Sequence, residues 1–86
     1  MKILVRKPCD AEIKFMSTQK TWESDICEFD YTYDSDETVL IDYGRAEVCC
    51  DGEWIEFSKG DLVFFPKYLD CKWRVLEPIR KFERWG

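Results

Sequence analysis

The residues of this chain that could do chemistry are a carboxylate on a strand, an isolated thiol and a pair of tyrosines. The 86-residue sequence contains no histidine, which excludes Cys-His and Ser-His-Asp mechanisms. Any general base must therefore be a carboxylate, a lysine, a tyrosine or a metal-bound water. Glu37 is the leading carboxylate because it shares an alternation face with Val39 and Ile41, and a buried carboxylate requires a partner or a raised pKa. The alternative is that Glu37 is a turn residue before the strand.

Two tyrosines, a cysteine and a tryptophan accompany Glu37 as candidate site residues. Tyr31 and Tyr33 lie on the apolar face of an alternating run, where they either fill a small barrel or present their hydroxyls to a ligand. Cys71 shares a strand face with Trp73 and is either a small core residue or a reactive thiol. Small-molecule sites are mostly apolar with a few convergent polar groups. We therefore predict that any ligand binds among Tyr31, Tyr33, Glu37, Cys71 and Trp73.

Two other features of the sequence have simpler structural interpretations. Adjacent residues of a strand face opposite sides, so a vicinal disulfide between Cys49 and Cys50 would disrupt the strand. We expect Cys50 to point inward and Cys49 outward. The basic segment Arg80–Arg84 is interpreted as a solvated strand face, with a docking patch for an anionic ligand as the alternative.

The clearest local signal among the positioning elements is a hairpin. Asp51-Gly52 lies between two runs of alternating apolar and polar residues, and this dipeptide favours a two-residue turn. The turn and the hydrophobic pattern together fix the register of the two strands. The predicted pairs that share one face are Val48 with Ile55 and Ala46 with Phe57.

The rest of the chain reads as short strands separated by turn residues, which is typical of an all-β sandwich or barrel. A period of two begins at Trp22, and a β-branched-rich run at Thr38–Tyr43 is expected to stop at Gly44. The other expected elements are a first strand at Lys2–Val5, one or two helical turns within Pro8–Met16 capped by Asp10, a strand at Leu62–Phe65 ended by Pro66, a turn at Glu77-Pro78 and a last strand at Ile79–Trp85.

Two blocks of the sequence also have the spacing of a known family. Six residues separate Glu37 from Gly44, five separate Gly60 from Pro66, and fifteen lie between Gly44 and Gly60. With the Trp73-Arg74-Val75 segment, this arrangement resembles the cupins, in particular the branch that contains EutQ-type and ureidoglycine aminohydrolase cupin domains. The resemblance covers roughly residues 22–85. It implies an all-β, RmlC-like cupin double-stranded β-helix, a jelly-roll barrel of two antiparallel sheets, in one domain spanning residues 1–86.

The resemblance also implies where a metal site would lie. Metal-binding cupins use two histidines and a glutamate from the first motif and a third histidine from the second. By spacing, the histidine positions fall on Tyr31, Tyr33 and Cys71, and the glutamate is kept as Glu37. Because a catalytic metal needs three or four protein ligands, we predict no stoichiometric metal and no cofactor. A metal, if bound, would use Glu37 and Cys71, a pair that suits zinc.

Three functions remain open at this point. The leading hypothesis is a stand-alone, metal-free cupin that binds a small molecule or acts as an interaction module. The alternative is a metal-dependent enzyme that acts on a small amide or amino compound, similar to the ureidoglycine relative, through Glu37 and Cys71. The third is a structural subunit whose barrel is filled by its own aromatic side chains.

Composition and charge limit the partners and the compartment. The net charge of −5 argues against nucleic acid and against an anionic membrane surface. The odd number of cysteines fits no closed disulfide framework, and no segment reads as a signal peptide or a membrane span, so we expect a reduced, cytoplasmic protein. Trp54 is expected on the outward face of the hairpin, and Trp85 lies one residue from the end of the sequence. Exposed tryptophans of this kind favour a homodimer.

Overall fold

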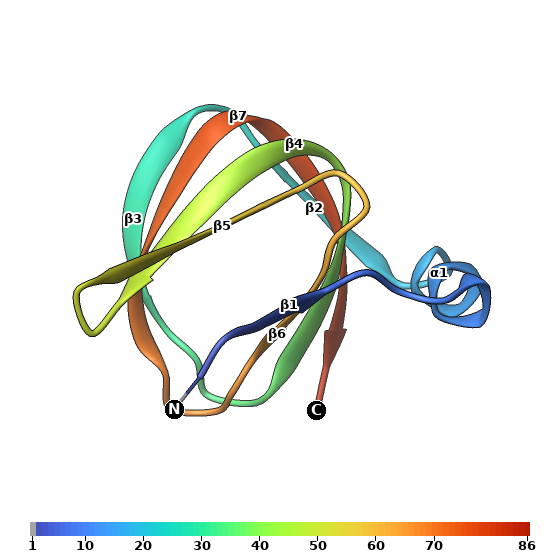
Figure 1. Ribbon diagram of the computed structural model, residues 1–86, viewed down its shortest axis with the longest axis horizontal. Coiled ribbons are helices and arrows are strands. Elements are labelled where there is room, and N and C mark those ends of the chain that lie inside the picture. The colour runs from blue at the N-terminus through green and yellow to red at the C-terminus, as the bar shows by residue number, and fades with distance from the viewer. Residues whose placement is uncertain (1) are drawn as a thin grey trace.

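The computed structural model describes residues 2–86 as an antiparallel β-barrel with one short helix on its outside (Figure 1). All strand pairs are antiparallel. The predicted all-β barrel of antiparallel strands is confirmed. The elements in chain order are β1 (Leu4–Arg6), α1 (Asp10–Met16), β2 (Lys20–Ser24), β3 (Cys27–Thr32), β4 (Glu37–Cys50), β5 (Glu53–Ser58), β6 (Leu62–Phe65) and β7 (Asp70–Trp85).

Two long, bent strands, β4 and β7, form the frame of the barrel. The first half of β4 pairs with β6 and with the second half of β7, and β2 and β1 extend this sheet at its two edges. The second half of β4 pairs with β5 and with the first half of β7, and β3 lies at the other edge. The two halves therefore face one another as two sheets that share β4 and β7.

The bends of these strands correct two sequence predictions. Gly44 does not end a strand, and Glu77-Pro78 does not separate two strands, because β4 and β7 run continuously through both positions. The β4–β7 register shifts between Ile41 and Ala46, as expected of β-bulges. Gly44 has a φ of +91°, and an added Cβ would lie 2.2 Å from the carbonyl oxygen of Pro78. Only glycine allows the two bent strands to approach this closely.

The hairpin between β4 and β5 has the predicted register. Val48 is opposite Ile55, and Ala46 is opposite Phe57. Asp51 and Gly52 have φ values of 54° and 79°, as a type I′ turn requires at its two central residues. Cys50 packs against the core, as predicted.

The N-terminal region differs slightly from its prediction. The first strand is Leu4–Arg6 rather than Lys2–Val5. The helix forms where expected, but Cys9 is its N-cap and Asp10 is its first residue. The amide of Cys9 donates to the Glu12 carboxylate at 2.9 Å. The helix covers the outer face of one sheet, where Met16 packs with three side chains: Leu40, Leu62 and Phe82.

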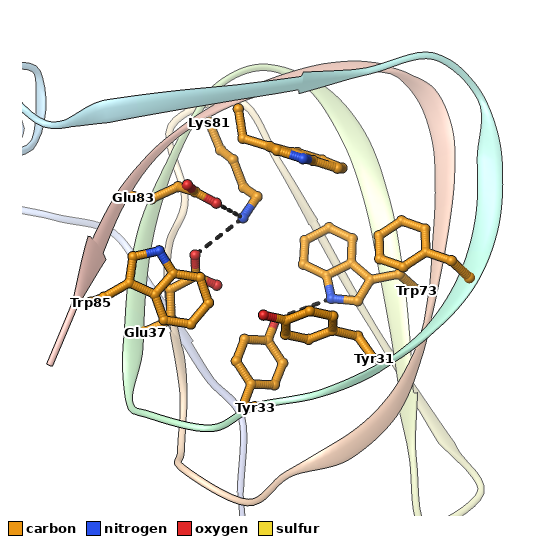
Figure 2. A pocket seen from close by; sticks show the side chains of 9 residues that line it. Tyr31, Tyr33, Glu37, Trp73, Lys81, Glu83 and Trp85 are labelled. Atoms are coloured by element: carbon orange, nitrogen blue, oxygen red, sulfur yellow. Dashed lines mark hydrogen bonds and ion pairs between the residues drawn. The ribbon is translucent and has the colours of Figure 1, made fainter.

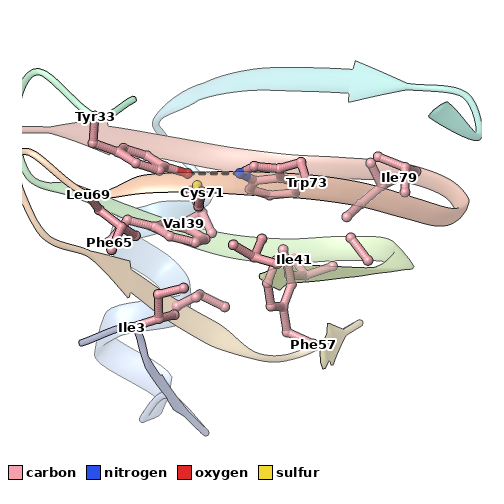
Figure 3. Packing of buried hydrophobic residues seen from close by; sticks show 14 residues of the cluster. Ile3, Tyr33, Val39, Ile41, Phe57, Phe65, Leu69, Cys71, Trp73 and Ile79 are labelled. Atoms are coloured by element: carbon pink, nitrogen blue, oxygen red, sulfur yellow. Dashed lines mark hydrogen bonds between the residues drawn. The ribbon is translucent and has the colours of Figure 1, made fainter. Parts of the chain in front are cut away.

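The main core fills one part of the barrel with close-packed rings and branched aliphatic side chains (Figure 3). Phe57 packs edge-on against Phe65 and Trp73, with ring centroids 6.0 and 5.4 Å apart. Phe65 in turn stacks on Tyr33, with centroids 4.8 Å apart. Offset and edge-to-face ring pairs of this kind add to the stabilisation from buried area.

Candidate functional site

A cavity of about 200 Å³ lies inside the barrel, beside the aromatic core (Figure 2). The side chains that form it come from both sheets, and two of its residues, Tyr31 and Trp85, are more than one-third exposed. The cavity is therefore reached from solvent past these two rings. Its lining residues are Trp22, Phe29, Tyr31, Tyr33, Glu37, Trp73, Lys81, Glu83 and Trp85.

One side of the cavity carries a cluster of three charged side chains. The ammonium of Lys81 donates to the carboxylates of Glu37 at 3.3 Å and Glu83 at 2.9 Å. Glu37 and Lys81 are only 1% and 5% exposed. The ammonium also lies 5.0 and 5.4 Å from the ring centroids of Trp22 and Trp73. Ion pairing and two ring faces together offset the cost of burying this charge.

The carboxyl group of Glu37 holds its proton far more tightly than usual. Burial, followed by the charge of Glu83, raises the pKa of Glu37 from 4.5 to about 7. The ammonium of Lys81 opposes this rise but does not cancel it. Because two carboxylates share one ammonium, the cluster carries a proton near neutral pH.

Tyr33 and Trp73 form the opposite, apolar side of the cavity. The indole N–H of Trp73 donates to the hydroxyl oxygen of Tyr33 at 3.1 Å, and the Tyr33 side chain is 1% exposed. Burial, and then the nearby charge of Glu37, raise the pKa of Tyr33 well above its usual value. Tyr33 therefore stays a neutral phenol, able to donate its own proton to a ligand.

Tyr31 lies at the entrance to the cavity. Its ring meets that of Tyr33 edge-on, with centroids 4.8 Å apart, and its side chain is 38% exposed. Partial burial raises the pKa of its hydroxyl. Tyr31 thus offers a ring and a neutral hydroxyl to a molecule that enters the barrel.

Cys71, the remaining candidate, does not line the cavity. Its thiol is buried in the core and donates to the backbone carbonyl of Tyr31 at 3.5 Å. Burial raises the pKa of the Cys71 thiol to about 12, so that the reactive thiolate is disfavoured. The structure thus brings together Tyr31, Tyr33, Glu37 and Trp73 around the cavity, and it leaves Cys71 outside that set.

Comparisons with known proteins decide the family. The family model described as EutQ-like cupin domain matches residues 12–82. The chain belongs to this cupin family. No curated protein matches it.

Solved structures with the same fold include relatives of very different length. A DUF861 family protein from Thermotoga maritima is 39% identical, with a TM-score of 0.94, over 99% of this chain and 100% of that chain. A putative ethanolamine utilization protein Q from Salmonella typhimurium is 23% identical, with a TM-score of 0.71, over 76% and 53% of the two chains. The EutQ protein of Clostridium difficile is also 23% identical, with a TM-score of 0.70, over 94% and 64%. These last two show the shared fold.

The side chains of this cupin do not fit a catalytic metal ion. Within residues 2–86, no group of three or more His, Cys, Asp and Glu side chains could hold one. Glu37 is engaged by the ammonium of Lys81, and Cys71 is a protonated thiol outside the cavity. The glutamate of the first motif therefore meets a cation that belongs to the protein itself.

Lys81 and Glu83 were missed by the sequence analysis. The interpretation of Arg80–Arg84 as a solvated strand face is wrong for Lys81, which is buried. The alternation along β7 could have indicated that Lys81 is buried. The inward residues Cys71 and Trp73 have odd numbers, and so do the buried residues Ile79 and Lys81. The predicted turn at Glu77-Pro78 separated these residues from the strand of Cys71 and Trp73. The continuous strand keeps the alternation instead, and places Lys81 and Glu83 on the inner face.

Proposed function

We propose that this cupin is a metal-independent binding module that takes a small molecule into the mouth of its barrel. The observation that carries the proposal is the buried cluster of Glu37, Lys81 and Glu83 at one side of an aromatic cavity. Apolar residues of similar volume often stabilise a fold as well as buried ion pairs do, or better. A charged cluster beside an accessible cavity therefore supports a binding role rather than a purely structural one.

The size and lining of the cavity limit its occupant. A volume of about 200 Å³ is below the roughly 300–1,000 Å³ of sites for drug-sized ligands, so the ligand has only a few non-hydrogen atoms. Its apolar part would contact rings such as Trp85. Its polar part would meet the carboxylates of Glu37 and Glu83 and the hydroxyl of Tyr33. These groups support a ligand that has a hydrogen-bond donor next to an apolar portion.

Tryptophan fluorescence gives a direct test of binding. Three of the four tryptophans line the cavity, and the fourth, Trp54, is on the outside, so a Trp54→Phe protein reports only on the cavity. A library of small polar molecules should contain compounds that saturate this signal. The same compounds should bind Glu37→Gln weakly, while Lys72→Met, an exposed change on β7, should leave binding unchanged. A library without any saturating compound, or equal binding by both variants, contradicts the proposal.

Metal independence has a separate test. We expect elemental analysis of purified protein to find far less than one Zn, Mn or Fe per chain, because Lys81 already pairs with Glu37. About one metal ion per chain, lost on Glu37→Gln, would overturn this expectation. The alternative, a metal-dependent enzyme acting through Glu37 and Cys71, is not proposed further because Cys71 lies outside the cavity.

The cytoplasm is the proposed compartment. All five cysteines are free, which supports a reducing environment. Within residues 2–86, no helix has the length and apolar character needed to cross a membrane.

A further inference from the structure

The charged cluster in the cavity is one positive charge short of balance. Glu37 and Glu83 contribute two carboxylates, and Lys81 contributes one ammonium. Lys81 contacts the Oε2 atom of each carboxylate, which leaves the two Oε1 atoms for another partner. An uncompensated negative charge in an apolar site is costly, so the site must take up either a proton or another cation.

Among the described residues 2–86, no other charged side chain that faces Glu37 supplies this missing cation. From β7 it meets Lys81 and Glu83, and from the side of β3 it meets the neutral phenols of Tyr31 and Tyr33. Asp34, a charge that acts on Tyr31 from the loop before β4, is exposed and is itself negative. In the protein alone a proton therefore balances the cluster, as the raised pKa of Glu37 indicates.

The cavity also has ring faces that suit a second cation. The ammonium of Lys81 lies over Trp22 and Trp73. Within the described chain, no lysine or arginine lies over the rings of Tyr31 and Trp85, which line the cavity at its entrance. Ring faces attract ammonium groups strongly where water is excluded. An anion, by contrast, would approach two carboxylates.

We propose that the cavity binds a small primary organic ammonium ion, which replaces the proton between Glu37 and Glu83. The inference rests on the proposed binding function and names its ligand class. The ligand ammonium donates to the free Oε1 atoms of the two carboxylates, and its short alkyl chain lies against the rings at the entrance. Protonated Glu37 and the ammonium ion give ionised Glu37 paired with the ammonium ion, and one proton passes to solvent.

Because the ammonium ligand replaces a proton, its affinity for the cavity should change with pH. Below the pKa of Glu37, about 7, ligand and proton compete, so affinity should fall by about tenfold per pH unit. Above that pKa the carboxylate is already ionised and affinity should level off. A primary alkylammonium has a pKa near that of lysine, roughly 10.4, so its own charge stays constant over this range.

Calorimetry with matched probes tests the inference. Methyl- to butylammonium chlorides are titrated at pH 5.5, 6.5, 7.5 and 8.5, each beside the alcohol and the carboxylate of the same chain length. We expect the ammonium ions to bind best, with the pH dependence above. Buffers of different ionisation enthalpy should show about one proton released at pH 5.5 and almost none at 8.5. Glu37→Gln should remove the pH dependence and weaken binding at least tenfold, and Lys72→Met should change neither.

The failures of the inference and of the proposed function are distinguishable. If alcohols or carboxylates saturate the cavity fluorescence as well as ammonium ions do, or if ammonium affinity is independent of pH, the ligand class is wrong and the binding function stands. If no small molecule saturates it, both are wrong. Should Glu37→Gln fail to fold, carboxyl NMR of the wild type replaces it: saturating ammonium must lower the pKa of Glu37, and an unchanged value overturns the inference.

Discussion

The two halves of β7 use the same alternation for opposite purposes. In the first half, the inward residues Cys71, Trp73 and Val75 are apolar and pack into the aromatic core. In the second half, the inward residues after Ile79 are Lys81 and Glu83, which line the cavity with Glu37. Both sets lie on one face of one strand. The two sets differ because the opposite sheet contributes rings that fill one end of the barrel and leaves space at the other end.

The comparison shows how a small barrel separates stability from binding. At the filled end, rings from β5 and β6 reach across and exclude solvent, so that apolar side chains are favoured. At the cavity end, space remains, and buried charges persist because they pair with one another. The filled end should therefore respond to lost volume, and the cavity end should respond to lost charge and to pH.

The largest expected effect is the loss of a ring at the filled end. Phe57→Ala should lower the free energy of unfolding by about 3–5 kcal/mol, because the cavity it leaves is closed in by Phe65 and Trp73. Urea unfolding measures the change. Trp54→Ala, on the outer face of the same strand, is the control and should cost much less. Equal losses from the two variants would contradict a packed core around Phe57.

A single charge removed at the cavity end should have the next largest effect. Lys81→Met leaves Glu37 and Glu83 without their ammonium and should cost about 3 kcal/mol at pH 8. At pH 5 the cost should be smaller, since Glu37 can take up a proton. The triple variant Lys81→Met, Glu37→Gln, Glu83→Gln removes all three charges and should recover most of the loss. A triple variant no more stable than the single one would show that Lys81 acts through packing alone.

The pH dependence of stability should also distinguish the cavity end of the barrel from the filled end. The pKa of Glu37 is raised from 4.5 to about 7 on folding, so the folded chain binds the proton more tightly. The resulting contribution to stability is fully present below pH 4.5 and is lost as the pH rises to about 7. The difference in unfolding free energy between wild type and Glu37→Gln should follow this course. The pKa of Glu12 is also shifted, chiefly by Arg6, which lowers it. Its effect on the unfolding free energy is the same in both proteins and cancels in the difference. A difference that is constant from pH 4 to 8 would contradict a buried, proton-holding Glu37.

The smallest expected effect on stability lies outside the barrel. The ring of Trp54 is 38% exposed and lies beneath the guanidinium of Arg74 at 4.1 Å. We predict a homodimer through this face, as exposed aromatic residues mark interfaces. Light scattering should give about twice the chain mass of 10.4 kDa, and Trp54→Glu should halve it with little change in unfolding free energy. A wild type that is already monomeric at micromolar concentration contradicts the dimer, and a dimer that survives Trp54→Glu contradicts this face.

The architecture and four of the cavity residues could be predicted from local patterns in the sequence. Alternation of apolar and polar residues produced the strands, and Asp51-Gly52 fixed a register that the structure confirms. These signals are local, since turn type and strand parity depend on neighbouring residues. The spacing of Glu37, Gly44, Gly60 and Pro66, together with the Trp73-Arg74-Val75 segment, indicated a cupin.

The contacts of Glu37, in contrast, could not be predicted from local patterns. Its partner Lys81 lies 44 residues away, and the contact depends on the pairing of β4 with β7. In β4 the bulges near Gly44 shift the inward parity from odd to even positions, whereas β7 keeps odd positions inward past Pro78. Whether a glycine or a proline ends a strand or bends it depends on the strand packed beside it. That long-range pairing placed Lys81 inside the barrel and Cys71 outside the cavity.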